Sequence, residues 1–326
     1  MEREEFTLVR DMLRTFATRF RTASADAVKA PTRADAQRAL DELGLTGLRR
    51  TSPPAATVQE CALLAEEHGR RPLTTSLLGT CLLAPDLLRL LEDGERPLSV
   101  RGSRPTVALS HDLRFPGPDP APLVAWDCEG ADAALLVDAE GRVTEHELGP
   151  TAPTADLLRA VRRASAEGRT VGRLTPDAHR RWQAYALVIA ASELVGAAGS
   201  FVEQSVAYAR ERIQYGQPIG SFQAVQHLLA DATVLVEACT SATRYAAWCL
   251  DSEPPNRALT AARVAKAEVN TSAVEAVYAG MQVFGGIAQT WEHVAHLYLR
   301  RVLVGATALA TTDDLLPALG APEATR

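Results

Sequence analysis

The chain has 326 residues, of which 34 are Lys or Arg and 40 are Asp or Glu, so its formal net charge is −6. With 47% hydrophobic positions, a chain of this length predicts a globular protein of roughly two domains with a substantial core. The acidic balance argues against general nucleic-acid binding, which requires a basic excess. The five cysteines are scattered, so the sequence predicts neither disulfides nor a zinc site and indicates a reducing, cytoplasmic location.

The two segments that most resemble targeting or membrane signals lack the necessary features. The N-terminal MEREEF is acidic, whereas a secretory signal begins with basic residues followed by an apolar run. The longest apolar stretch, Tyr185 to Val202, contains Glu193 near its centre. Because a membrane span is longer and does not hold an unpaired carboxylate, we expect a buried bundle helix and no membrane span.

Residues 1–95 are predicted to form a helical N-terminal domain. Thr32 and Thr57 each precede a helical segment that has an acidic residue three positions later, Asp35 and Glu60. Both threonines are therefore predicted helix N-caps. Three glycines are predicted to end helices: Gly44, Gly69 and Gly94.

Residues 96–174 are predicted to form a reduced β-rich middle domain and linker. Four short β-prone runs are separated by turn residues, and these runs are PTVALS, PLVAW, AALLVD and RVTEHEL. The proline-rich segment FPGPDPAP is expected to be irregular. Only about fifty residues remain for strands, so we expect a modest sheet.

Residues 175–326 are predicted to form a C-terminal antiparallel four-helix bundle, because long helical segments are joined by short connections. The predicted helices are Pro176 to Arg212, Phe222 to Leu250, Asn256 to Phe284 and Trp291 to Leu309. The predicted fold class is therefore mainly α with a small β middle domain.

The connection between the first two bundle helices, RERIQYGQPIGSFQAVQ from Arg210 to Gln226, is the most distinctive stretch of the chain. Its glycines and proline force a tight bend, and Ser221 is a predicted N-cap of the second helix. Arg212 lies at the end of the first helix, and its planar fork of donors suits a pyrophosphate or a carboxylate. A surface salt bridge is the more common role of such an arginine.

The connection after the third helix, MQVFGGIAQT from Met281 to Thr290, combines an amide side chain with adjacent glycines. Gly285 and Gly286 permit close approach of a ligand or another backbone, and Gln282 both donates and accepts hydrogen bonds. An ordinary helix C-cap is the simpler interpretation of the glycine pair on its own.

Together, these two connections resemble the acyl-CoA dehydrogenase family. The resemblance extends to HLLADA, to LYLRR near the end of the chain and, more weakly, to LGLTGL, AEEHGRRPL and DCEGADAALLV. It implies a helical N-domain, a β-barrel-like middle domain and a four-helix bundle, assembled as dimers or tetramers. It also implies that a carboxylate removes the α-proton of an acyl-CoA thioester while the β-hydride passes to FAD, and that an electron-transfer protein accepts the electrons.

The resemblance also implies which residues would line the FAD of a neighbouring subunit. They are Arg212, Gln214, Tyr215, Ile219, Phe222, Gln282 and Gly286. Arg212 would hold the pyrophosphate, the apolar side chains would pack on the adenosine part, and Gln282 would form hydrogen bonds. No metal site is expected, because His293 and His296 share a helical spacing without a carboxylate or cysteine ligand set.

The chain lacks the carboxylate that the family uses as its base. The family places it either on the first bundle helix, where this chain has Ala186, or in a Glu-Gly-Thr turn after the Arg-rich helix, which corresponds to Leu309–Ala310. Loss of a general base slows a reaction by about 10² to 10⁴. Three acids are possible substitutes: Glu193, about 10 Å along the helix from Ala186, and Asp313 and Asp314, a few residues past the second position.

The family segments that would hold FAD within the same subunit are also missing. The chain has no Thr-Glu-Pro or Gly-Ser-Asp segment and no strand recognisable as the tryptophan-containing one that covers the flavin, and TSPPAATV replaces a Gly-Gly-rich loop. Heteromeric steroid side-chain dehydrogenases of actinobacteria divide such a site between two chains. The leading hypothesis is therefore a subunit that completes the FAD site of a paralogous catalytic partner, in a heterotetramer.

Two alternatives remain. One is a self-sufficient acyl-CoA dehydrogenase, acting as a homo-oligomer with an unrecognised base. The other is a repurposed or non-catalytic family member of a biosynthetic pathway. The acyl group is expected to be bulky, such as a steroid side chain, because Ala186, Ala190 and Ala191 are small.

Overall fold

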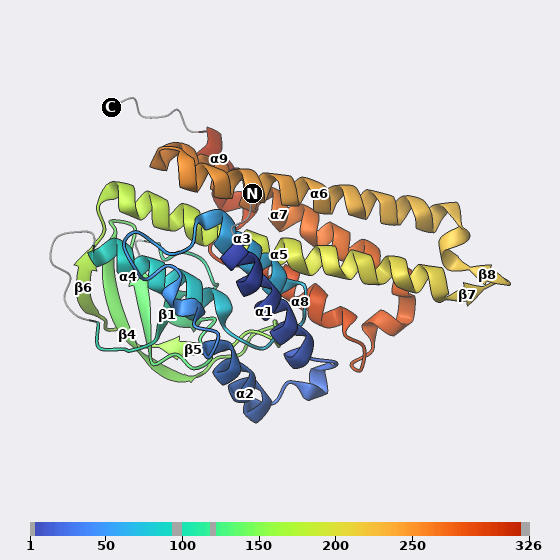
Figure 1. The fold of residues 1–326 in the computed structure, drawn as a ribbon, viewed down its shortest axis with the longest axis horizontal. Helices are drawn as coiled ribbons and strands as arrows, with labels where there is room; N and C mark the ends of the chain where they lie inside the picture. The colour runs from blue at the N-terminus through green and yellow to red at the C-terminus, as the bar shows by residue number, and fades with distance from the viewer. Residues whose placement is uncertain (1–3, 93–99, 118–121, 321–326) are drawn as a thin grey trace.

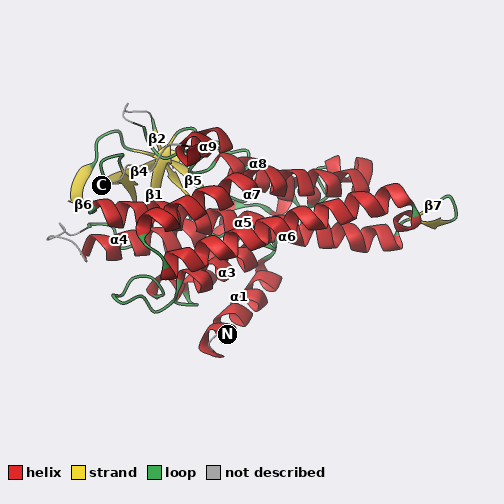
Figure 2. Ribbon diagram, turned by 90° about the horizontal axis from the view of Figure 1, so that it is seen from above, coloured by secondary structure: helices red, strands yellow, loops and turns green. Residues whose placement is uncertain are grey.

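The computed structural model describes residues 4–92, 100–117 and 122–320. Its helices and strands form an N-terminal helical part, a small sheet and a bundle of long helices (Figure 1). The six-stranded sheet lies at one end of the molecule, and the long helices extend well past it (Figure 2). The predicted fold class, mainly α with a small β middle part, is confirmed.

The N-terminal part contains the helices α1 (Glu4–Phe20), α2 (Ala30–Asp41), α3 (Val58–Gly69) and α4 (Ala84–Glu92). Thr57 caps α3 as predicted, because its hydroxyl accepts the Glu60 N–H while the Glu60 carboxylate accepts the Thr57 N–H. The prediction for Thr32 is wrong: α2 already begins at Ala30, with Pro31 in its first turn. Gly94 lies outside the described residues.

The middle part is a six-stranded sheet that closes into a small barrel. Its strands are β1 (Pro105–Ser110), β2 (Leu123–Trp126), β3 (Ala133–Val137), β4 (Arg142–Thr151), β5 (Val161–Ala164) and β6 (Arg169–Arg173). Their order is β3-β1-β2-β5-β4-β6, and an additional pairing of β3 with β4 completes the ring. Among the strand pairs of this sheet in the described ranges, β1 and β3 alone run parallel, with Val107 opposite Leu135. Closure removes most of the free strand edges.

The C-terminal part is built around α5 (Pro176–Glu211), followed by α6 (Gln223–Ser252), α7 (Pro255–Phe284), α8 (Ala295–Thr307) and α9 (Thr312–Gly320). The fourth bundle helix begins at Ala295 and not at Trp291, because the short helix η5 (Gly285–Gln289) and a turn precede it. In the described part of the chain, α5 alone is long and apolar enough to cross a membrane. However, 94% of its most apolar window is buried, so α5 is a core helix, as predicted.

The backbones of α3 and α5 touch at two glycines. A Cβ atom added to Gly69 would lie 2.0 Å from the carbonyl oxygen of Glu193, and one added to Gly196 would lie 1.9 Å from that of Glu66. No side chain larger than hydrogen fits at either position without a backbone shift. This contact fixes the N-terminal helices against the centre of the bundle.

Candidate functional site

The first distinctive connection forms a small hairpin at the far end of the bundle. Arg212 caps the C-terminus of α5, and the chain continues through β7 (Ile213–Gln214), β8 (Gln217–Pro218) and η4 (Ile219–Ser221). Tyr215 and Gly216 form the turn with φ of 51° and 79°, the left-handed conformation that a tight hairpin requires. The Ile219 N–H donates to the Arg212 carbonyl at 2.8 Å, which holds the hairpin against the helix end.

Most of the predicted flavin-contacting side chains on this hairpin are open to solvent. Arg212 and Gln214 are exposed and Tyr215 is 93% exposed, while the rings of Tyr215 and Phe222 meet edge to face with centroids 6.2 Å apart. Ser221 is not the N-cap of α6; that position is occupied by Phe222. Within the described ranges, the Arg212 side chain makes no ion pair or hydrogen bond. Its donors are therefore available to an external anion.

The second connection lies at the same end of the bundle. Val283 of α7 packs in one apolar cluster with Ile219, and the rings of Tyr208 and Phe284 stack with centroids 4.5 Å apart. Next to Val283, the Gln282 side chain is exposed. The structure therefore brings together at one end of the bundle all seven residues predicted to contact FAD (Figure 1).

The glycine pair leaves open backbone beside Gln282. Gly285 has φ of 66° and ψ of −144°, which only glycine adopts readily, so it ends α7. Nothing lies within 4 Å of a Cβ atom built on Gly286. A ligand can therefore approach the backbone at this turn.

The two histidines of the next segment have structural partners. The His296 ring stacks on Trp291 at 5.3 Å and shares a hydrogen bond with its carbonyl at 3.1 Å. His293 Nδ1 accepts the Ala295 N–H at 3.1 Å. Across residues 4–92, 100–117 and 122–320, no group of three or more His, Cys, Asp or Glu side chains could hold a metal ion.

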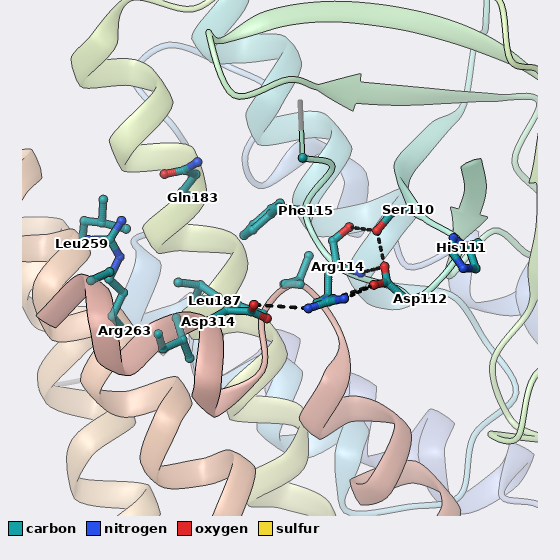
Figure 3. Close-up of a pocket in the computed structure, with 15 residues that line it drawn as sticks. Ser110, His111, Asp112, Arg114, Phe115, Gln183, Leu187, Leu259, Arg263 and Asp314 are labelled. Carbon is teal, nitrogen blue, oxygen red and sulfur yellow. Dashed lines mark hydrogen bonds and ion pairs between the residues drawn. The ribbon is translucent and has the colours of Figure 1, made fainter. Parts of the chain in front are cut away.

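The two positions of the family base lie in one apolar cluster near the middle barrel. Ala186 is fully buried, and Leu309–Ala310 belong to the same cluster. Leu187, beside Ala186, lines a cavity of about 520 Å³ that Leu309–Ala310 also line (Figure 3). Neither position presents a carboxylate. The small residues Ala190 and Ala191 are buried in packed core and do not line this cavity.

The segment at the second base position is bonded directly to the middle part of the chain. The Leu309 N–H donates to the Leu113 carbonyl at 2.7 Å, and the Phe115 N–H donates to the Leu309 carbonyl at 2.9 Å. The backbone of Leu309 itself has φ of 70°, which is uncommon for a non-glycine residue. This pairing fixes the apolar segment where the family carries its Glu-Gly-Thr turn.

Of the two paired acids near the chain end, one faces this cavity. Asp314 lines it and accepts hydrogen bonds from the N–H (2.9 Å) and hydroxyl (2.7 Å) of Thr311, while Arg114 lies 3.3 Å away. Burial would raise the pKa of Asp314, but these hydrogen bonds and Arg114 lower it below its ordinary value. A lowered pKa weakens a general base. Asp313 is exposed and does not line the cavity.

Glu193 is surrounded by cationic and hydrogen-bonding groups and is 1% exposed. Its carboxylate accepts from Arg301 Nη1 at 2.9 Å, contacts His68 Nδ1 at 3.0 Å and forms an ion pair with Arg159. Burial would raise the pKa of Glu193, but Arg159 and Arg301 hold it well below its ordinary value. This environment makes the carboxylate a poor proton acceptor, which argues against Glu193 as the base.

The ion pairs of Glu193 belong to a larger buried network. Arg159 also binds Asp127 at 2.7 Å, and Arg301 lies 2.6 Å from Asp156. The network joins α3, the middle barrel, α5 and α8. Its members are His68, Asp127, Asp156, Arg159, Glu193 and Arg301. No local sequence pattern predicts this network, because its members are far apart in the chain and follow no periodic spacing.

A tryptophan at the end of β2 lies against this network. Trp126 is 2% exposed, and the guanidinium of Arg159 lies 4.7 Å from the centroid of its ring. The Thr106 hydroxyl donates to the Trp126 carbonyl at 2.6 Å. One face of this ring is therefore occupied by a charge of the network, in a cation–π contact.

Comparisons with known proteins agree with these features. The sequence profile of the acyl-CoA dehydrogenase C-terminal domain matches residues 185–311. Acyl-CoA dehydrogenase IpdE2 of Mycobacterium tuberculosis is 31% identical over 259 residues, which cover 79% of this chain and 75% of that protein. IpdE2 of Mycolicibacterium smegmatis is 30% identical over 80% of this chain and 78% of that protein.

Solved structures share the fold over almost the whole chain. A variant of the Tcur3481-Tcur3483 steroid ACAD superposes with a TM-score of 0.78 at 24% identity, covering 97% of both chains. The ChsE4-ChsE5 complex from Mycobacterium tuberculosis superposes with a TM-score of 0.76 at 18% identity, covering 98% of this chain and 97% of that one. At these identities the likeness concerns the fold alone.

Proposed function

Because the chain belongs to the acyl-CoA dehydrogenase family, we propose that it completes the FAD site of a paralogous catalytic subunit that desaturates an acyl-CoA thioester. The observation that carries the proposal is that this chain retains one part of the family's active site and lacks another. The surface that would meet a neighbour's FAD is complete and open at the far end of the bundle, whereas both base positions are apolar and buried.

The residues at the end of the bundle fit one half of an FAD molecule. Arg212 offers a planar set of donors to the pyrophosphate, and Gln282 offers an amide beside the open backbone of Gly286. Tyr215 and Phe222 present aromatic surface to the adenine. Bound FAD supplies the hydride acceptor of the family's reaction. The role of this chain is to bind and orient that FAD on its partner.

Within this chain, the region around the middle barrel fits FAD poorly. Arg159 covers the Trp126 ring, and Leu309 pairs directly with Leu113 and Phe115. The names of two structural relatives, Tcur3481-Tcur3483 and the ChsE4-ChsE5 complex, each designate a pair of chains, and the first is called a steroid ACAD. These names support a heteromeric assembly with a bulky acyl substrate. The proposal includes an electron-transfer protein as electron acceptor because the resemblance to the family implies one.

The test is retention of FAD by the chain co-expressed with its paralogous partner, measured from the visible absorption spectrum. Arg212→Ala is expected to weaken FAD binding by about tenfold or more, because a charge-assisted pyrophosphate contact is lost. Arg210→Ala is the matched control. Arg210 is exposed near the same helix end and is not among the residues assigned to FAD, so this variant should retain FAD as the unmodified chain does.

A self-sufficient acyl-CoA dehydrogenase is the competing function, and it predicts that the chain binds FAD and oxidises acyl-CoA without a partner. Asp314 lines the cavity beside Leu309–Ala310, which favours it as a base in a self-sufficient enzyme. If the chain alone retains FAD, acyl-CoA bleaches that flavin, and Asp314→Asn abolishes the bleaching, the self-sufficient enzyme is correct and the divided site is wrong. Equal FAD retention by the Arg212→Ala and Arg210→Ala complexes would also contradict the proposed role of Arg212.

A further inference from the structure

The cavity beside the apolar base positions has the size and walls of a small-molecule site. It measures about 520 Å³ and lies between the loop after β1 and the helices α5, α7 and α9 (Figure 3). Cavities that hold small organic ligands span about 300 to 1,000 Å³ and are mostly apolar, with a few polar groups. Its apolar lining includes Phe115, Leu187, Leu259, Leu315 and Ala318.

The two arginines that line this cavity differ in whether they have an ion-pair partner. Arg114 is bound on both sides, to Asp112 and, at 3.3 Å, to Asp314. Arg263, half-buried on α7, makes no side-chain hydrogen bond or ion pair with the residues that the structure describes. Burial lowers the pKa of Arg263, and no carboxylate among the described residues offsets this effect. A half-buried guanidinium without a counter-ion is a vacant position for an anion.

The surroundings of Arg263 restrict what that anion can be. Leu259 precedes Arg263 by one helical turn, so the two side chains lie on the same face of α7. Apolar surface therefore adjoins the charge. The carboxylates of Asp112 and Asp314 line the same cavity and disfavour a multiply charged ligand such as a phosphate ester. A single negative charge on an apolar body matches both features.

We propose that this cavity binds a small amphipathic carboxylate, with its anionic group on Arg263 and its apolar body against Leu187, Leu259 and Leu315. The cavity adjoins the middle barrel, and the FAD surface is at the far end of the bundle. The proposal therefore does not rest on the divided FAD site. The carboxylate can come from a free acid or from the distal end of an acyl group carried on coenzyme A.

Binding to the full-length chain without flavin tests the proposal by calorimetric titration, with octanoate as the probe and octan-1-ol as its uncharged control. Octanoate is expected to bind the unmodified chain and to lose about tenfold or more in affinity with Arg263→Gln. Arg257→Gln is the matched control, because Arg257 is on the same helix, pairs with Glu253 at 3.1 Å and does not line this cavity. It should bind octanoate normally.

Two further measurements distinguish the remaining outcomes. Ala318→Phe is expected to exclude octanoate by filling the cavity while Arg263 is retained. A comparison of suberoyl-CoA with octanoyl-CoA identifies the source of the carboxylate. If the chain prefers suberoyl-CoA and this preference depends on Arg263, the carboxylate is carried on a coenzyme A thioester. If octanoate binds and this preference is absent, the ligand is a free acid. Absence of binding by both octanoate and suberoyl-CoA, or equal affinities in Arg263→Gln and the unmodified chain, overturns the proposal.

This test and that of the FAD site can fail separately. The cavity experiment contains no flavin and no partner, and it changes Arg263. The FAD experiment changes Arg212 at the opposite end of the bundle.

Discussion

At the scale of single residues, Glu193 connects three parts of the chain through ion pairs. Its carboxylate is buried between Arg159 of the middle part, Arg301 of α8 and His68 of α3. A buried ion pair adds little net stability compared with an apolar replacement, but removal of one partner leaves the others uncompensated. The network therefore makes the fold sensitive to loss of this one charge.

We expect Glu193→Gln to lower the free energy of unfolding by about 3 to 5 kcal/mol at neutral pH, because two buried arginines lose their shared counter-ion. Glu203→Gln, on the same helix, removes an exposed pair with Arg70 and should cost under about 1 kcal/mol. Urea denaturation followed by circular dichroism measures both. Equal midpoints for the two variants would show that the network does not stabilise the fold.

At the scale of elements, the contact of α3 with α5 depends on two glycines that leave no room for side chains. Gly196→Ala would place a methyl group against the Glu66 carbonyl, so we expect a loss of about 3 kcal/mol from overpacking. At Gly199, one turn later, the added Cβ atom would meet only the Val236 side chain, at 3.3 Å. Gly199→Ala should be neutral or stabilising by up to about 1 kcal/mol, since alanine favours helix. Thermal unfolding compares them; similar melting temperatures would contradict the packing argument.

The elements differ in how far local sequence predicts them. The capping box at Thr57 and the long helices α5 to α7 were predicted, because caps and apolar periodicity are local signals. The strands β5 and β6 were missed, because VRRA and RTVGR are short and rich in arginine. Thr32 was misread as a cap because Pro31 also starts helices well.

The residues of the candidate site also differ in whether the sequence alone predicts them. The residues from Arg212 to Phe222 that are predicted to contact FAD could be named from the sequence because they are nearly contiguous and resemble a family motif, and their contact with FAD stays a prediction. Arg263 was missed: a single arginine on a helix gives no signal until tertiary packing places it in a cavity, where it pairs with no carboxylate among the described residues. The environment of Glu193 was missed for a related reason, since His68 is 125 residues away in the chain.

At the scale of the whole molecule, the buried network links all three parts, so acid should affect them together. The folded pKa of Glu193 is lowered, so its stabilisation is complete above the unfolded value of about 4.3 and is lost as the pH falls below it. We expect the stability difference between the unmodified chain and Glu193→Gln to narrow below about pH 4. Denaturant titrations at several pH values test this; a constant difference down to pH 3 would refute it.

The same linkage predicts how acid unfolding proceeds in the unmodified chain. Tryptophan fluorescence, which includes the buried Trp126 of the barrel, and far-ultraviolet circular dichroism, which reports mainly the helices, should change at the same pH. A fluorescence change that clearly precedes the loss of helix would contradict unfolding of the three parts as one unit.

The backbone pairing of Leu309 has a consequence for attempts to introduce a carboxylate base at this position by protein engineering. A glutamate introduced there would occupy a position that is 1% exposed, on a backbone already bonded to Leu113 and Phe115 and held at a positive φ. The new carboxylate would be buried without a partner and would favour its protonated form. A working base at this position would require redesign of both segments, so we expect that Leu309→Glu alone does not provide one.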